Sequence, residues 1–102
     1  MASTTLFYDN MSSWKSFKVK HEYIGMRTEK STLVQMPPDS IYMGYQTWIS
    51  NKLVRESDGD YTIAIRPGFD VVLELVAKDE NGTLHSVHKK KISGDEFREQ
   101  FL

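Results

Sequence analysis

Two short acidic turns constrain this sequence more than any other feature, because each separates two runs of strand-forming residues. The first is ESDGD (56–60), with Asp-Gly at its tip, and the second is DENG (79–82), which ends in Asn-Gly. These dipeptides are typical of tight β-hairpin turns, where the central residues take positive φ. The pattern predicts antiparallel hairpins, and it lacks the alternation of strands with helices that a parallel sheet needs.

The runs around these turns have the spacing of strands. In WKSFKVKHEYIG, Phe17, Val19, His21 and Tyr23 share one predicted strand face, and lysines occupy the other. From Ile41 to Arg55 the alternation changes phase at Ser50-Asn51, which predicts a bulge, a bend or two short strands. The remaining strands are expected at TLVQM (32–36), YTIAIR (61–66), DVVLELVAK (70–78, the most apolar run and the expected central strand) and TLHSVHKKKI (83–92).

The C-terminal segment SGDEFREQFL (93–102) has a helical pattern instead. Ser93 and Glu96 have the spacing of a capping box, and Phe97 and Phe101 lie on one helical face. A helix this short needs tertiary contacts, so both rings are expected to dock on the sheet.

The predicted fold class is therefore mainly β (α+β): a small curled or barrel-like antiparallel sheet of about six strands, with one short C-terminal helix. Residues 1–13 are expected to form a flexible N-terminal arm, and residues 14–102 a single β-rich domain.

Composition narrows the functional classes. The 102 residues include no cysteine and carry a formal net charge of −1, so neither thiolate chemistry nor a global positive field is available. No apolar run is long enough to span a bilayer, and the N-terminus lacks the pattern of a secretory signal, so we expect a cytoplasmic protein that does not bind membranes.

The motifs of common enzymes are absent from the sequence. His85 and His88 are three apart, which on a regular strand places them on opposite faces and argues against a shared metal ion. The acidic residues gather at turns, where Asp bonds to the local backbone. We therefore expect no enzymatic activity, no metal and no cofactor.

What remains is a pairing of aromatic residues with cations, the combination that binds single-stranded nucleic acid by base stacking and phosphate contacts. Trp48 lies close to Lys52 and Arg55 in the sequence, and its strand face also carries Tyr42 and Gly44. The candidate nucleic-acid-binding residues are Trp48, Lys52, Arg55, Lys18, Lys20, Arg66, Lys89, Lys91 and Tyr42.

Two alternatives stay open for these residues. Trp48 is either a stacking platform or a ring covered by the C-terminal helix. Lys89 and Lys91 share a face from which Lys90 points away, and the run is equally consistent with a solvated edge that discourages aggregation.

The segments YQTWISNKLVRESDGDYTIAI and KKKISGDEFREQF resemble a family of small single-stranded-DNA-binding accessory proteins. These proteins belong to the replication modules of Gram-positive mobile elements, meaning phages, plasmids and chromosomal cassettes. The resemblance covers Phe17 to Leu102. It implies binding of single-stranded DNA without sequence preference, alongside a helicase or polymerase, with Trp48, Lys52 and Arg55 as the positions carried across.

Two functional hypotheses follow. The first is a non-enzymatic protein that binds single-stranded nucleic acid. The second is a protein-interaction module, such as a phage-type inhibitor or regulator that docks on a host protein, since exposed aromatics suit protein interfaces too. Under either hypothesis, exposed edge strands offer a route to a homodimer.

Overall fold

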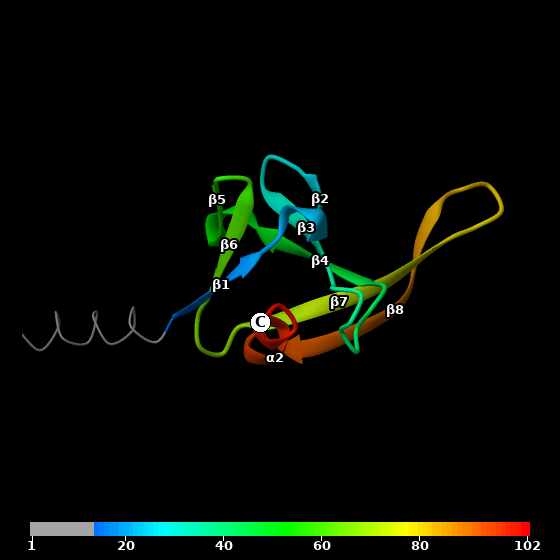
Figure 1. Ribbon diagram of the computed structural model, residues 1–102. Coiled ribbons are helices and arrows are strands. Elements are labelled where there is room, and N and C mark those ends of the chain that lie inside the picture. The colour runs from blue at the N-terminus through cyan, green and yellow to red at the C-terminus, as the bar shows by residue number, and fades with distance from the viewer. Residues whose placement is uncertain (1–13) are drawn as a thin grey trace, which may run out of the picture.

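The computed structural model describes residues 14–102, so the predicted N-terminal arm lies outside the described residues. The described chain forms eight strands, with all neighbouring strands antiparallel, in two sheets (Figure 1). The smaller sheet has the order β1-β6-β5, from Lys15–Val19, Asp60–Ile65 and Val54–Ser57. The larger has the order β2-β3-β4-β7-β8, from Ile24–Arg27, Ser31–Gln35, Tyr45–Ser50, Asp70–Lys78 and Leu84–Ser93.

The prediction of a mainly β fold with one short C-terminal helix is confirmed, but the single curled or barrel-like sheet of about six strands is wrong. Two segments turn at a 3₁₀ helix, η1 (His21–Tyr23) and η2 (Asn51–Leu53). The continuous strand predicted through His21 and Tyr23 is therefore wrong, whereas the change predicted at Ser50-Asn51 is confirmed as a bend between two short strands. The two halves of each segment then join different sheets, which gives more strands and separates the sheets. β7 also lies beside the middle strand of the larger sheet, which is β4.

Local hydrogen bonds explain the break at η2. The Ser50 hydroxyl accepts a hydrogen bond from the Lys52 amide, as Ser does at helix N-termini. The Asn51 side chain is held by Thr32, whose hydroxyl donates to Asn51 Oδ1 at 2.6 Å, and it donates in turn to the Thr28 carbonyl at 2.9 Å. These bonds fix the bend that the phase change at Ser50-Asn51 predicted as two short strands.

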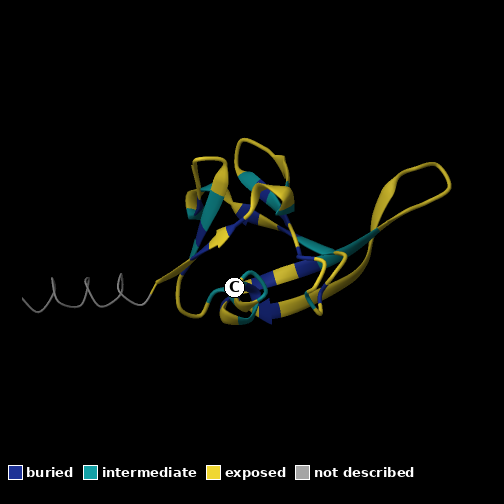
Figure 2. Cartoon of the chain, viewed as in Figure 1, coloured by how far each residue is buried: buried dark blue, intermediate teal, exposed yellow. Residues whose placement is uncertain are grey.

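One buried cluster contains residues of both sheets and of the helix (Figure 2). Phe17, Val19 and Ile63 come from the smaller sheet, while Val34 and Leu73 come from the larger one. The alternation predicted for Phe17 and Val19 is confirmed, but His21 is exposed because η1 interrupts the strand.

The C-terminal helix α2 (Gly94–Glu99) begins as predicted, since the Ser93 hydroxyl accepts from the Glu96 amide at 3.1 Å. The predicted docking of both rings is also confirmed. Phe97 is fully buried with its ring edge-on to Phe17, and Phe101 stacks on Phe17 and lies edge-on to Tyr23. The helix therefore closes the core from the side of β1, η1 and the ends of β7 and β8.

The two hairpins predicted at ESDGD (56–60) and DENG (79–82) are present, as β5–β6 and β7–β8. Asp58 and Gly59 take positive φ (54° and 84°) at the β5–β6 turn, as their dipeptide predicted. The β7–β8 hairpin is much longer, and its distal part projects beyond the rest of the described chain (Figure 1).

Candidate nucleic-acid interface

Trp48 is exposed on the outer face of β4. Its neighbours Thr47 and Ile49 point into the core, so strand alternation turns the indole outward, where 44% of the residue is accessible. The helix does not cover this ring, because the aromatic residues of the helical segment pack on Phe17 and Tyr23. Of the two alternatives left open for Trp48, the covered ring is excluded.

The indole lines a surface hollow of about 300 Å³ between β4 and β7. Val72 of β7 forms part of its floor and is itself half exposed. Phe69, in the turn before β7, closes one end of the hollow. An aromatic ring beside an open apolar floor is a geometry that a flat ligand ring can stack on.

A second hollow adjoins the first at Phe69. It has a volume of about 210 Å³ and is lined by Trp14, Ser50, Lys52, Leu53, Arg66 and Phe69. Trp14 is 42% exposed, so a second indole lies open to solvent beside Lys52 and Arg66. We call the combined area of Trp14, Trp48, Lys52, Arg66 and Phe69 the two-tryptophan surface.

The cations of this surface, Lys52 and Arg66, have no carboxylate partner among residues 14–102. Both side chains are exposed. A third hollow continues from Ser50 and Lys52 to Lys30, which adds another exposed cation at that end. Ammonium and guanidinium groups without carboxylate partners are available to phosphate oxygens.

Arg55 and Lys18 extend the cationic area along the smaller sheet. Lys18 of β1 and Arg55 of β5 both pair with Thr62 of β6, so the three residues form one cross-strand row on one sheet face. By strand alternation this is also the face of Trp14 and Arg66, which lie just beyond the ends of β1 and β6. The smaller sheet thus presents Trp14, Lys18, Arg55 and Arg66 on its outer side.

Lys20 is also exposed but belongs to another hollow. This hollow, of about 400 Å³, lies at the edge of β1 and is lined by Lys18, Lys20, Tyr23, Pro37, Asp39, Asp60, Gln100, Phe101 and Leu102. Asp39 and Asp60 bring negative charge close to both lysines, so this end of the row is electrostatically mixed.

Lys89 and Lys91 lie on the face of Trp48, since Lys89 is in register with Glu74 and Glu74 with Gln46 of β4. Each ammonium group has a carboxylate partner, at 3.7 Å on Glu74 and at 3.4 Å on Asp70. These pairs neutralise the predicted lysine patch. The side of the surface beyond Trp48 is therefore not basic.

Tyr42 is the site residue that the structure places elsewhere. The residue is 5% exposed, so its ring has no free face for a base. Its hydroxyl donates to the Glu96 carboxylate, and this bond, together with burial, raises the pKa of Tyr42. Tyr42 does not lie in a strand as predicted, because Ile41 to Gly44 form turns. Its hydrogen bond to Glu96 connects these turns to the helix.

The sequence reasoning missed Trp14 and Phe69. Trp14 begins the segment WKSFKVKHEYIG and stands directly before Lys15, so the sequence does show an aromatic residue beside a cation there. Phe69 follows the turn residues Pro67-Gly68, and no strand or helix periodicity assigns it to a face. No local pattern announces that both rings meet Lys52 and Arg66, because the contact depends on how β1, β6 and η2 are placed.

The prediction that His85 and His88 lie on opposite strand faces is wrong. A β-bulge shifts the register, so that His88 faces Leu75 and His85 faces Ala77, and both histidines lie on the same side of the hairpin. They still act separately. His85 Nε2 lies 2.8 Å from Asp79 Oδ2, and His88 Nδ1 lies 2.9 Å from the Tyr45 hydroxyl. Residues 14–102 contain no cluster of three or more metal-ligating side chains.

No family model, no curated protein and no solved structure matches this chain. The resemblance to replication accessory proteins therefore stays a prediction. Within residues 14–102, no helix has the length and apolar character needed to cross a membrane.

Proposed function

We propose that this protein binds single-stranded nucleic acid, preferentially DNA and without sequence preference, through the two-tryptophan surface. The observation that carries the proposal is the adjacency of two exposed indoles, Trp14 and Trp48, with Lys52 and Arg66. Each indole can stack on a base of any identity, and such stacking contributes about 1–3 kcal/mol per base.

The backbone of the strand would follow the cations. Lys52 and Arg66 line the Trp14 hollow, which adjoins the Trp48 hollow at Phe69, and the row of Lys18 and Arg55 continues from Trp14 along the smaller sheet. Sequence preference is not expected, because stacking on an indole and contacts with phosphates do not read the edge of a base. The role beside a helicase or polymerase of a mobile element rests on the sequence resemblance alone.

The chain's two tryptophans allow a test that assigns the binding surface. Trp14→Phe leaves Trp48 as the only indole, and Trp48→Phe leaves Trp14. Titration of each variant with an oligothymidine at low salt should quench the remaining fluorescence in both cases. Quenching in neither variant would refute the proposal, and a protein that binds duplex as tightly as single strands would refute the preference for single strands.

A second candidate, the protein-docking module, is favoured by one observation. The hollow at Trp48 is also lined by Val72 and by Asp70 and Glu74, whose carboxylates pair with lysines, so this part of the surface is apolar with balanced charge. Trp48→Ala that leaves oligonucleotide binding intact, while Trp14→Ala abolishes it, would assign the Trp48 hollow to a protein partner.

A further inference from the structure

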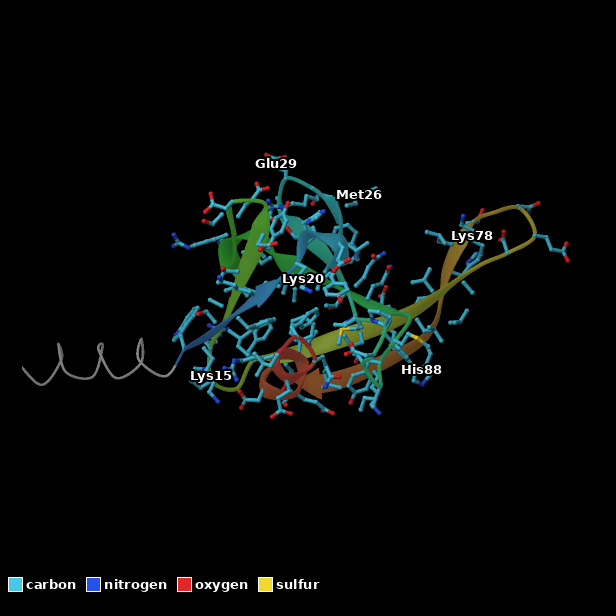
Figure 3. All side chains as sticks on the ribbon, in the orientation of Figure 1. Lys15, Lys20, Met26, Glu29, Lys78 and His88 are labelled. Atoms are coloured by element: carbon cyan, nitrogen blue, oxygen red, sulfur yellow. The ribbon has the colours of Figure 1, made fainter. Side chains whose placement is uncertain are left out.

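The projecting part of the β7–β8 hairpin, residues 76–87, is here called the arm. It is a two-stranded ribbon that extends from the larger sheet, with Lys78 along it and His88 at its base (Figure 3). Leu84 and Val87 on β8 are 60% and 57% exposed. A two-stranded ribbon alone is only marginally stable in water, so exposed apolar side chains on it are unusual without a partner.

β8 is an edge strand of the larger sheet. Among residues 14–102 the five-stranded order ends at β8, so no described strand bonds to the backbone groups on its outer side. The lysines at residues 89–91 discourage pairing of this edge with another strand, but LHSVH (84–88) contains no Lys, Arg, Asp or Glu. The arm portion of β8 therefore lacks this charge protection.

The direction of the free backbone groups can be assigned. The Thr83 carbonyl accepts from the Asp79 amide at 3.0 Å, so the backbone of Thr83 faces β7. Because backbone direction alternates along an antiparallel strand, Leu84 and Ser86 direct their N–H and C=O groups to the open side. They form a short template for one more antiparallel strand.

Charge is arranged along the same edge with opposite signs at its two ends. Asp79 and Glu80 lie in the turn at the end of the arm, and Lys89, Lys90 and Lys91 lie beyond its base. Antiparallel pairing of two identical β8 edges about His85 would join Leu84 to Ser86 of a second copy in both directions. The same register would set Lys90 of each copy, which forms no ion pair among residues 14–102, opposite Glu80 of the other.

We propose that the arm is a self-association surface, on which a second copy of this chain pairs through β8 to form a two-fold symmetric dimer. The complementary ends favour this occupant over a nucleic acid, which the acidic turn repels. The interface is a short ribbon contact, so the dimer is weak and dissociates on dilution. The proposal does not depend on the proposed function, and it is tested without nucleic acid.

The first experiment is sedimentation equilibrium of the full chain from about 5 to about 500 µM at low and high salt. A dimer should appear as concentration rises and should weaken with salt, because the lysine and acidic ends are exposed. A monomer at every concentration would overturn the proposal.

The matched variants are Ser86→Pro and Ser86→Ala. Proline removes the outward N–H of residue 86 without removing a hydrogen bond inside the arm, and proline is tolerated on edge strands for that reason. Ser86→Pro should be monomeric, and Ser86→Ala should dimerise like the natural sequence. Equal dimerisation of the two variants would contradict pairing through this edge.

A charge variant and an exchange measurement keep the test independent of proline. Glu80→Lys should weaken the dimer about fivefold, since two symmetry-related exposed contacts are lost, whereas Asp79 is kept because it holds the turn. In the natural sequence, amide exchange at Leu84 and Ser86 should slow as concentration rises, and exchange there that is independent of concentration would overturn the proposal.

Discussion

Removal of the two cations that line the Trp14 hollow is the sharpest test of the proposed surface. The double variant Lys52→Ala/Arg66→Ala removes both cations of the hollow at Trp14 and leaves both tryptophans in place. If Lys18, Lys52, Arg55 and Arg66 each contact one phosphate, log K for a single strand should fall against log salt with a slope of about −2.8, because each contact contributes about −0.7. The double variant should fall with a slope of about −1.4.

The same relation sets the loss of affinity at fixed salt. Relative to 1 M salt, each phosphate contact contributes about 0.7 log units at 0.1 M, so the double variant should bind about 25-fold more weakly there. The two lines should converge near 1 M salt, where the electrostatic contribution vanishes. A loss that persists at 1 M would have another origin, such as misfolding.

The assay is fluorescence titration with an oligothymidine at several salt concentrations between about 50 and about 400 mM. Lys78→Ala is the matched control, because it removes one exposed cation on the arm, away from the two-tryptophan surface. Both variants should melt at the temperature of the natural sequence, since neither Lys52 nor Arg66 is buried. A double variant with the same slope as Lys78→Ala would refute the assignment of phosphates to these cations.

Three further predictions concern the fold that carries the surface. Phe97→Ala should destabilise the protein by about 3–5 kcal/mol in denaturant unfolding, because the ring is fully buried against Phe17, whereas a small effect would mean that the helix is not part of the cooperative core. Ser93→Ala should cost about 1 kcal/mol through loss of the helix cap, and an unchanged unfolding midpoint would contradict this role. The hydrogen bond from His85, and then the bonds from the turn amides, lower the pKa of Asp79. The ionised Asp79 carboxylate therefore stabilises the arm turn above the ordinary pKa of Asp, and this stabilisation is lost as pH falls through the lowered pKa. Amide exchange in the turn should accelerate over that pH range, and Asp79→Asn should abolish the pH response.

The sequence predicted those elements whose signals are local. Asp58-Gly59 formed its tight turn because both residues tolerate positive φ, and Ser93 capped its helix because the hydroxyl reaches an amide three residues later. The strand predicted at YTIAIR (61–66) formed as β6, and its alternation buries Ile63 and Ile65. In each case the cause lies within a few residues along the chain.

The incorrect predictions share a different cause. The segment through His21 has the alternation of a continuous strand, but it turns at the 3₁₀ helix η1, where the Tyr23 amide donates to the Lys20 carbonyl. The bulge in β8 likewise moved His85 onto the face of His88. Ile41 and Met43 alternate as strand residues, yet both lie exposed in turns, because Tyr42 between them is drawn inward to Glu96. A single-residue change of register is invisible to periodicity.

The same difference between local signals and contacts between distant residues applies to the candidate site. The strand face of Trp48 followed from its parity with Tyr42 and Gly44, but periodicity left open whether the C-terminal helix covers the ring. The grouping of Trp14 with Lys52 and Arg66 was not open to prediction, because these residues come from β1, η2 and the end of β6 and meet only in the folded chain. Charge pairing was equally hidden, since Glu74 and Asp70 reach Lys89 and Lys91 across strands.

Net charge is a poor guide to this surface, because it averages over local differences. The formal value of −1 sums cations on the outer side of the smaller sheet with acids at the turn tips, such as Asp58 and Glu80, and with the lysine-paired Asp70 and Glu74 beside Trp48. At physiological salt the Debye length is about 8 Å, so a phosphate at the two-tryptophan surface senses Lys52 and Arg66 but not the acids at the far end of the projecting arm. Local arrangement therefore decides whether the proposed binding occurs.

The dimer proposed for the arm would also keep both copies of the surface on one side of a continuous sheet, because a two-fold axis between antiparallel strands is perpendicular to the sheet. A single strand long enough to reach both would then bind more tightly than either surface alone predicts.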